Sequence, residues 1–82
     1  NPFTGTTLLS VQLAAPSLID LAVYDNAGRV VRRLAASQPV TRQAGFVWNG
    51  RDERGRTVAR GIYFYRVKSP QGEAWGKVVL DR

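Results

Sequence analysis

The sequence predicts an all-β sandwich of six or seven short strands, and three observations lead to this fold class. Segments rich in valine, leucine, isoleucine and aromatic residues recur along the chain, as is typical of strands. Clusters of turn-forming residues separate these segments. No stretch of ten or more residues keeps apolar positions at helical spacing between helix start and stop signals. These patterns favour a sandwich over a helical or α/β domain.

A strong turn punctuates the first part of the chain. We expect strands over residues 7–14, 17–25 and 29–34. The turn at residues 25–28 has the sequence Asp-Asn-Ala-Gly, in which the Asp and Asn side chains can bond to the backbone locally. Gly28 accepts a positive φ there.

The second part of the chain contains the strongest strand signal. A looser stretch containing Pro39 leads to a strand at residues 45–49, after which residues 50–55 form a polar loop. A very short strand is predicted at 57–59, the longest at 61–69, and the last at 73–81.

The last two strands are predicted to form a hairpin with a definite register. Pro70 and Gly72 suit the corners of a tight turn, so Ser69 is expected to pair with Gly72. The core face would then pair Val67 with Ala74, Tyr65 with Gly76 and Tyr63 with Val78. The other face would bring Arg66 onto Trp75 and Lys77 onto Phe64 as cation–aromatic contacts. A bulge at Gly72 would shift this register by one residue.

Length and composition limit what the chain can do. Its 82 residues and 9.1 kDa allow one domain, and no apolar run approaches the roughly 20 residues that span a bilayer. The chain contains no Cys, His or Met. This excludes disulfides, thiol nucleophiles and imidazole chemistry. Because Met is absent, we expect residues 1–82 to be a single module of a longer protein.

The net charge of +6 is carried largely by arginine, which supplies ten of the twelve basic residues. Such a balance can indicate an anionic partner. The arginines are nevertheless spread along the chain, and only residues 51–60 are dense in them. A solvated surface is therefore favoured over a nucleic-acid-binding patch, and no nucleic-acid partner is expected.

Four segments carry a resemblance to a known family. They are the opening NPF followed by TTL, then VYDNAGRVVRRL, WNGRDERGRTVARGIYFYRV and KVVL. In this order they resemble the C-terminal sorting domain (type A) of type IX secretion substrates, to which an immunoglobulin-like domain of the flagellar hook-capping protein is related. The family commonly opens with NPFNP, and Thr4-Gly5 departs from that pattern.

The resemblance implies an immunoglobulin-like sandwich of about seven short antiparallel strands. It also implies a non-catalytic C-terminal module of a larger secreted protein, often a hydrolase or adhesin. The outer-membrane secretion machinery and the N-terminal cargo domains would be its partners, and it would reach the cell surface through the periplasm. The residues implicated in sorting by this resemblance are Gly61, Tyr63, Lys77, Val78, Val79 and Leu80.

A carbohydrate-binding accessory module is one alternative. Trp48, Tyr63 and Tyr65 are candidates for a sugar platform, but they share faces with core residues, so core packing is favoured. Trp75 differs, because the predicted register places it outward beside Arg66. It is a candidate surface aromatic that binds a ligand, is covered by Arg66, or is buried against the parent protein.

The remaining candidate sites are weaker. Asn49, Asp52 and Glu53 suggest a calcium loop, but their spacing is wrong and arginines surround them, so an Asx-stabilised turn is favoured. No glycine-rich loop opens a helix, and no pair of carboxylates proposes a catalytic site. We therefore expect no enzyme, no metal and no cofactor. A hook-cap-like structural scaffold and, last, a basic nucleic-acid binder remain as other functions.

Overall fold

The computed structural model describes residues 2–3 and 5–81, and this part of the chain consists of strands, turns and loops without a helix. It accordingly contains no helix that could cross a bilayer. Asn1 and Thr4 of the opening segment, and Arg82, lie outside the described residues. The seven strands are β1 (Pro2–Phe3), β2 (Thr7–Gln12), β3 (Ser17–Tyr24), β4 (Val30–Val40), β5 (Gln43–Trp48), β6 (Gly61–Ser69) and β7 (Gly72–Leu80).

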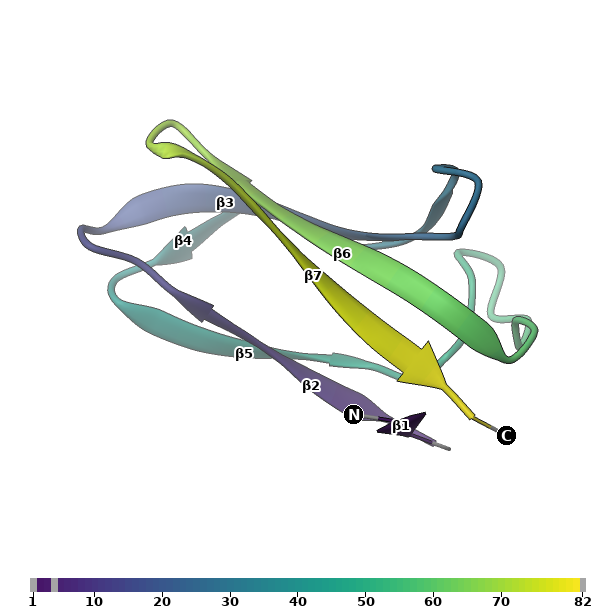
Figure 1. Ribbon diagram of the computed structural model, residues 1–82. Helices are drawn as coiled ribbons and strands as arrows, with labels where there is room; N and C mark the ends of the chain where they lie inside the picture. Colours follow the sequence, from purple (N-terminus) through teal and green to yellow (C-terminus); the bar gives the residue numbers. More distant parts are fainter. Residues whose placement is uncertain (1, 4, 82) are drawn as a thin grey trace.

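The strands form two layers, as Figure 1 shows. One layer is a five-stranded sheet in the order β1-β7-β6-β3-β4, and the other is the pair β2-β5. All neighbours are antiparallel except β1, which runs parallel to β7. The predicted all-β sandwich of about seven short antiparallel strands is thus confirmed, and the parallel pairing of the two-residue β1 is an additional feature. A two-residue strand carries no periodicity from which its pairing could be predicted.

Strand β4 departs most from the sequence prediction, because it continues through Pro39 to Val40. Pro39 pairs with Leu18 of β3, and β4 is an edge strand, where proline is tolerated because one side of the strand makes no ladder bonds. A shift in register precedes Pro39, and the Asp20 carboxylate accepts a hydrogen bond of 2.9 Å from the backbone N–H of Ser37. Ser37 has a φ of 48°, which is typical of a bulged residue held by such a contact.

Smaller corrections concern strand boundaries. The strand predicted at 7–14 ends at Gln12, and that predicted at 45–49 begins at Gln43 and ends at Trp48. The short strand predicted at 57–59 is absent from the described chain, where a single bridge joins Arg51 to Thr57 instead. The loop bonds to itself, for example from the Val58 N–H to the Gly50 carbonyl at 3.1 Å.

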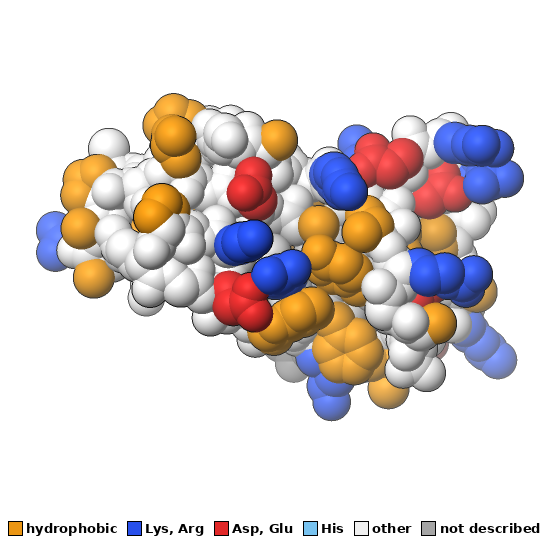
Figure 2. All heavy atoms as spheres, turned by 90° about the horizontal axis from the view of Figure 1, so that it is seen from above, with side chains coloured by type: hydrophobic (Ala, Val, Ile, Leu, Met, Phe, Trp, Pro, Cys, Tyr) orange, Lys and Arg blue, Asp and Glu red, His pale blue; other side chains and the backbone are white. Residues whose placement is uncertain are grey.

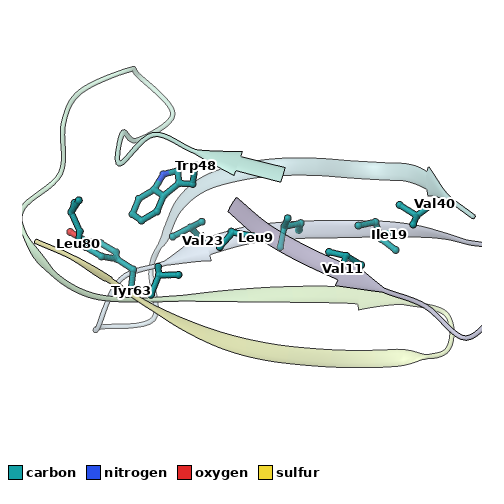
Figure 3. Packing of buried hydrophobic residues seen from close by; sticks show 10 residues of the cluster. Leu9, Val11, Ile19, Val23, Val40, Trp48, Tyr63 and Leu80 are labelled. Carbon is teal, nitrogen blue, oxygen red and sulfur yellow. The ribbon is translucent and has the colours of Figure 1, made fainter. Parts of the chain in front are cut away.

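The core lies between the two layers, and Figure 3 shows its side chains pointing into this space. Alternate residues of β2 and β3 are buried, as is typical of a sheet with one face in the core. Each fully buried aliphatic or aromatic side chain contributes about 1.5–3 kcal/mol to stability. The buried residues are Leu9, Val11, Ile19, Leu21, Val23, Val40, Trp48, Tyr63, Val78 and Leu80.

Candidate recognition surface on the last two strands

All eight residues proposed for recognition lie on the β6–β7 hairpin. The ladder starts at the Ser69–Gly72 pair and continues without a shift to Gly61 opposite Leu80. The register predicted from the turn is therefore confirmed, and the one-residue shift at Gly72 is excluded. Val67–Ala74, Tyr65–Gly76, Tyr63–Val78, Arg66–Trp75 and Phe64–Lys77 are all cross-strand pairs.

Gly61 and Tyr63 fix the beginning of the hairpin. Gly61 has a φ of 146°, which L side chains rarely adopt, and an added Cβ would meet no atom within 4 Å. Backbone conformation, and not space, therefore requires glycine here. Tyr63 is 7% exposed, and its hydroxyl donates a hydrogen bond of 2.5 Å to the carbonyl of Ala59. A tyrosine that bonds to the backbone a few residues upstream is a corner found in immunoglobulin-type sandwiches.

The aromatic residues considered as a sugar platform belong largely to the core. Trp48 is fully buried, and its ring meets that of Tyr63 edge-on at 5.2 Å between centroids. The Trp48 indole N–H donates to the carbonyl of Arg51 at 3.0 Å. Tyr65 is partly buried and packs against the core. The prediction of core packing is confirmed for these three rings.

The terminal segment Lys77–Leu80 alternates between the two faces of the sheet. Val78 and Leu80 point into the core, where they are 7% and 1% exposed. Lys77 is exposed on the outer face, and Val79 is partly buried opposite Ile62. A partner that contacts the folded domain therefore meets Lys77 and Val79, while Val78 and Leu80 act through the packing of the strand.

Trp75 stands on the outer face of the five-stranded sheet and is 55% exposed. The guanidinium carbon of Arg66 lies 5.6 Å from its ring centroid, and the Tyr24 ring lies 5.3 Å away at an interplanar angle of 46°. Arg66 Nε donates to Glu73 Oε2 at 2.8 Å, and a second guanidinium nitrogen donates to the same oxygen. Trp75 is thus contacted by Arg66 and still accessible.

Figure 2 views this outer face, where hydrophobic side chains gather in the middle with charged side chains beside them. The hydrogen bond from Arg66 holds the pKa of Glu73 below its ordinary value, although desolvation opposes the shift. Hydrogen bonds to Glu73 and to Tyr24 raise the pKa of Arg66. Both groups therefore stay charged near neutral pH, and the indole is held beside a fixed ion pair. We call Tyr24, Arg66, Glu73 and Trp75 the Trp75 cluster.

Sequence reasoning found only half of the Trp75 cluster. Glu73 was recognisable in principle, because the predicted register places it diagonally opposite Arg66, a spacing at which long side chains meet. Tyr24 was not recognisable, because no pattern in the neighbouring sequence indicates that β3 pairs with β6. The second expected cation–aromatic contact, Lys77 on Phe64, does not form within the described part of the chain, where Arg66 contacts Trp75 in this way. The physical reason is hydration: the Lys77 ammonium group binds water more strongly than a guanidinium group does, so it gains less by stacking on a ring.

A groove of about 360 Å³ runs beside the hairpin, between β2 and β7. Its walls mix apolar side chains, such as Val11, Leu13 and Val67, with polar ones. Trp75 is also among the residues that line it. Small-molecule sites usually place a few convergent polar groups in an apolar cleft, and we assign no ligand to this groove.

The loop considered for calcium is an Asx-stabilised turn, as the sequence predicted. The Asp52 Oδ1 atom accepts backbone N–H bonds from Arg54 at 2.9 Å and Arg56 at 3.0 Å. The N–H bond from Arg56 is the main cause of a lowered Asp52 pKa, and desolvation opposes it. The structure describes no cluster of three or more acidic, His or Cys side chains suited to a metal.

One end of the molecule holds most of the net charge. Residues 25–33, which comprise the first turn and the start of β4, and the loop at 51–60 contain seven arginines and three acidic residues, a net +4 of the chain's +6. These segments contact each other, since the Glu53 N–H donates to the Val31 carbonyl at 3.1 Å. Ion pairs of Asp25 with Arg29 and of Asp52 with Arg56 use part of this charge within the turns.

Two facing sheets, the tyrosine corner at Tyr63 and a first strand parallel to the last define this domain as an immunoglobulin-like β-sandwich. Residues 1–73 match the family model of the FlgD Ig-like domain. The chain belongs to that family, whose domains are structural and non-catalytic. Searches of curated proteins and of solved structures found no match for this chain.

Proposed function

We propose that the domain is a non-catalytic recognition module whose last two strands are contacted by a protein partner. The observation that carries this proposal is Trp75, which is 55% exposed yet fixed by Arg66 and Tyr24. Trp, Tyr and Arg are enriched among the residues that dominate binding energy at protein interfaces. Because the β6–β7 ladder is regular, these side chains are presented by a rigid element and little ordering entropy opposes binding.

The finer proposal concerns the partner and rests on the four sequence segments. Their resemblance to type IX sorting domains supports recognition by the outer-membrane secretion machinery. The module would then form the C-terminal part of a larger secreted protein and direct it through the periplasm to the cell surface. Lys77 would present a charge to the machinery, while Gly61 and Tyr63 hold the hairpin and Val78, Val79 and Leu80 keep its last strand in place.

Localisation of a reporter tests this proposal. A fluorescent protein with an export signal at its N-terminus and residues 1–82 at its C-terminus is expressed in a host with type IX machinery and in a machinery-null strain. We expect surface or medium signal that disappears in the null strain. Periplasmic retention in both strains would reject the sorting role.

Point variants separate recognition from folding in this assay. Deleting Lys77 onward would remove buried Val78 and Leu80, so retention after that deletion would not be informative by itself. We expect Trp75→Ala and Lys77→Gln to reduce export while the domain stays folded. Leu8→Ala is the matched control, because Leu8 is 62% exposed on the opposite sheet and its loss should leave export unchanged.

A structural scaffold similar to a hook-cap domain is the second candidate, and the family match over residues 1–73 favours it. In that role the outer surfaces would pack against other domains of an assembly. Equal localisation in both strains, together with loss of assembly of the parent protein when the Trp75 cluster is altered, would support it. Soluble oligosaccharides provide a further control, since a change in Trp75 fluorescence on titration would instead indicate a carbohydrate-binding module.

A further inference from the structure

Strand β7 leaves most of its outer edge unpaired. Within the described residues, β1 pairs only with Val79 and Leu80, and no strand lies beside residues 73–77. Ser69 and Gly72 close a two-residue loop, so they form a hydrogen-bonded pair, and bonded pairs then alternate along the ladder. The backbone groups of Glu73, Trp75 and Lys77 therefore point away from β6, towards the open edge. Such a row of free donors and acceptors is a template for another strand.

Two side chains of opposite charge flank Trp75 along this edge. Glu73, Trp75 and Lys77 share the outer face, with the acidic residue two positions before Trp75 and the basic residue two positions after it. If β7 of a second copy ran antiparallel to this strand and was centred on Trp75, a residue of opposite charge would lie against both Glu73 and Lys77. The inner face between these residues carries only Ala74 and Gly76, which leave room for an approaching strand.

We propose that two copies of this chain pair through β7, antiparallel about a two-fold axis at Trp75. Glu73 of each copy then lies opposite Lys77 of the second copy, and Trp75 lies opposite its own equivalent. Ala74 faces Gly76 across the contact. The outward backbone groups of the three outer residues exchange hydrogen bonds as antiparallel pairs do. The contact is self-complementary, as a two-fold interface must be.

The charges select a second copy in this orientation over other arrangements. A parallel, in-register pair would place Glu73 against Glu73 and Lys77 against Lys77, and like charges directly opposite are destabilising. A shift by one residue would turn every side chain to the other face. Lys77 has no ion-pair partner among the described residues, and both Arg66 contacts use a single Glu73 oxygen, Oε2. A lysine alone would protect an edge, but here each lysine meets an acid.

The association is expected to be weak, because only one short strand from each copy is in contact. Interfaces well below the standard size are typical of transient complexes. A dissociation constant on the order of 0.1–1 mM is expected in solution, falling as salt is lowered. The proposal concerns the isolated chain and does not rest on the proposed recognition function.

Sedimentation velocity tests the pairing over total concentrations from about 10 µM to about 1 mM. Any purification tag is placed after Arg82, because β1 at the other end of the chain pairs with β7. Wild-type protein should show a monomer–dimer equilibrium. Glu73→Lys and Lys77→Glu each create like-charge pairs at both ends of the contact, so each alone should dimerise about tenfold more weakly or not at all.

Mixing the two charge variants is the decisive measurement. In the mixed pair, the lysine introduced at position 73 would face the glutamate introduced at position 77, and the native Lys77 and Glu73 would face each other at the other end. An equimolar mixture should therefore regain association as a heterodimer. Because Glu73→Lys also removes the Arg66 ion pair, thermal unfolding must show that both variants are folded. Failure of the folded mixture to associate would overturn the proposal.

A second variant tests the backbone contact independently of charge. Trp75→Pro removes an N–H that points away from β6, so the monomer should fold, which circular dichroism checks, while dimerisation is lost. Leu8→Ala on the other sheet should leave dimerisation unchanged. Wild-type protein that is monomeric at about 1 mM, or dimers that persist in both single charge variants and in a folded Trp75→Pro variant, would each reject pairing through β7.

Discussion

The ring of Tyr65 lies directly over Gly76, its partner across the β6–β7 ladder. A Cβ added to Gly76 would lie 2.1 Å from Cζ of Tyr65, so Gly76→Ala must displace the ring from the core edge. We expect this variant to lower the free energy of unfolding by about 1–3 kcal/mol, measured by urea denaturation. Gly5→Ala, where an added Cβ meets nothing within 4 Å, is the matched control.

A double variant tests the same contact more directly. Once Tyr65→Ala has removed the ring, Gly76→Ala should cost much less than it does in the wild-type protein, because the steric conflict no longer exists. Strictly additive effects in the double-mutant cycle would contradict the contact, since residues that touch show coupling.

The hydroxyl of Tyr63 provides the second prediction. Tyr63→Phe keeps the ring against Trp48 but removes the hydrogen bond to the Ala59 carbonyl. We expect a loss of about 1 kcal/mol in the free energy of unfolding. Tyr65→Phe should be nearly neutral, because the structure records no hydrogen bond from the Tyr65 hydroxyl among the described residues. Equal losses in the two variants would contradict a specific role of the corner.

The hairpin shows why part of the structure was predictable from sequence. Pro70 and Gly72 fix the turn, and the turn fixes which residues pair across the whole ladder, since a hairpin register depends on loop length. The outward position of Trp75 and its contact with Arg66 follow directly from that register. The Asx turns at Asp25 and Asp52 were equally local, and each carboxylate accepts N–H bonds two and four residues onward.

Features that depend on distant segments were not predictable. Proline usually interrupts a strand. Pro39 lies in one because β4 is an edge strand and because the hydrogen bond from the Ser37 N–H to the Asp20 carboxylate holds the bulge before it. Tyr24 joins the Trp75 cluster because β3 pairs with β6, a pairing decided by the packing of whole sheets. The open edge of β7 likewise depends on how little of it β1 covers.

The Asx turns predict a dependence of stability on pH. The N–H bond from Arg29 is the main cause of a lowered Asp25 pKa, with desolvation opposing it, and Arg56 has the same effect on Asp52. A carboxyl whose pKa is lower in the folded state stabilises the fold above its unfolded value, near 3.9, and loses that contribution as pH falls through the folded pKa. The melting temperature should therefore decrease below about pH 4.

Substitution at both aspartates checks the origin of this decrease. The double variant Asp25→Asn/Asp52→Asn keeps side-chain acceptors but removes both titrating groups, so its melting temperature should change less between neutral and acidic pH. Asn26→Ser alters the same turn without removing a titrating group and should keep the wild-type slope. An unchanged slope in the double variant would assign the acid sensitivity to other carboxylates.

The two tryptophans predict two separate fluorescence environments. Trp48 is fully buried, whereas Trp75 is 55% exposed beside the Arg66 cation. Trp75→Phe should change the free energy of unfolding by no more than about 0.5 kcal/mol, and its remaining emission should shift to shorter wavelength and resist quenching by iodide. Trp48→Phe should be destabilised by more than about 1 kcal/mol and retain the iodide-sensitive emission. Iodide quenching of Trp75→Phe equal to that of the wild type would contradict the placement of both rings. Because Trp75 supplies the accessible signal, this pair of variants also decides whether a partner that alters the fluorescence has bound at the Trp75 cluster or elsewhere.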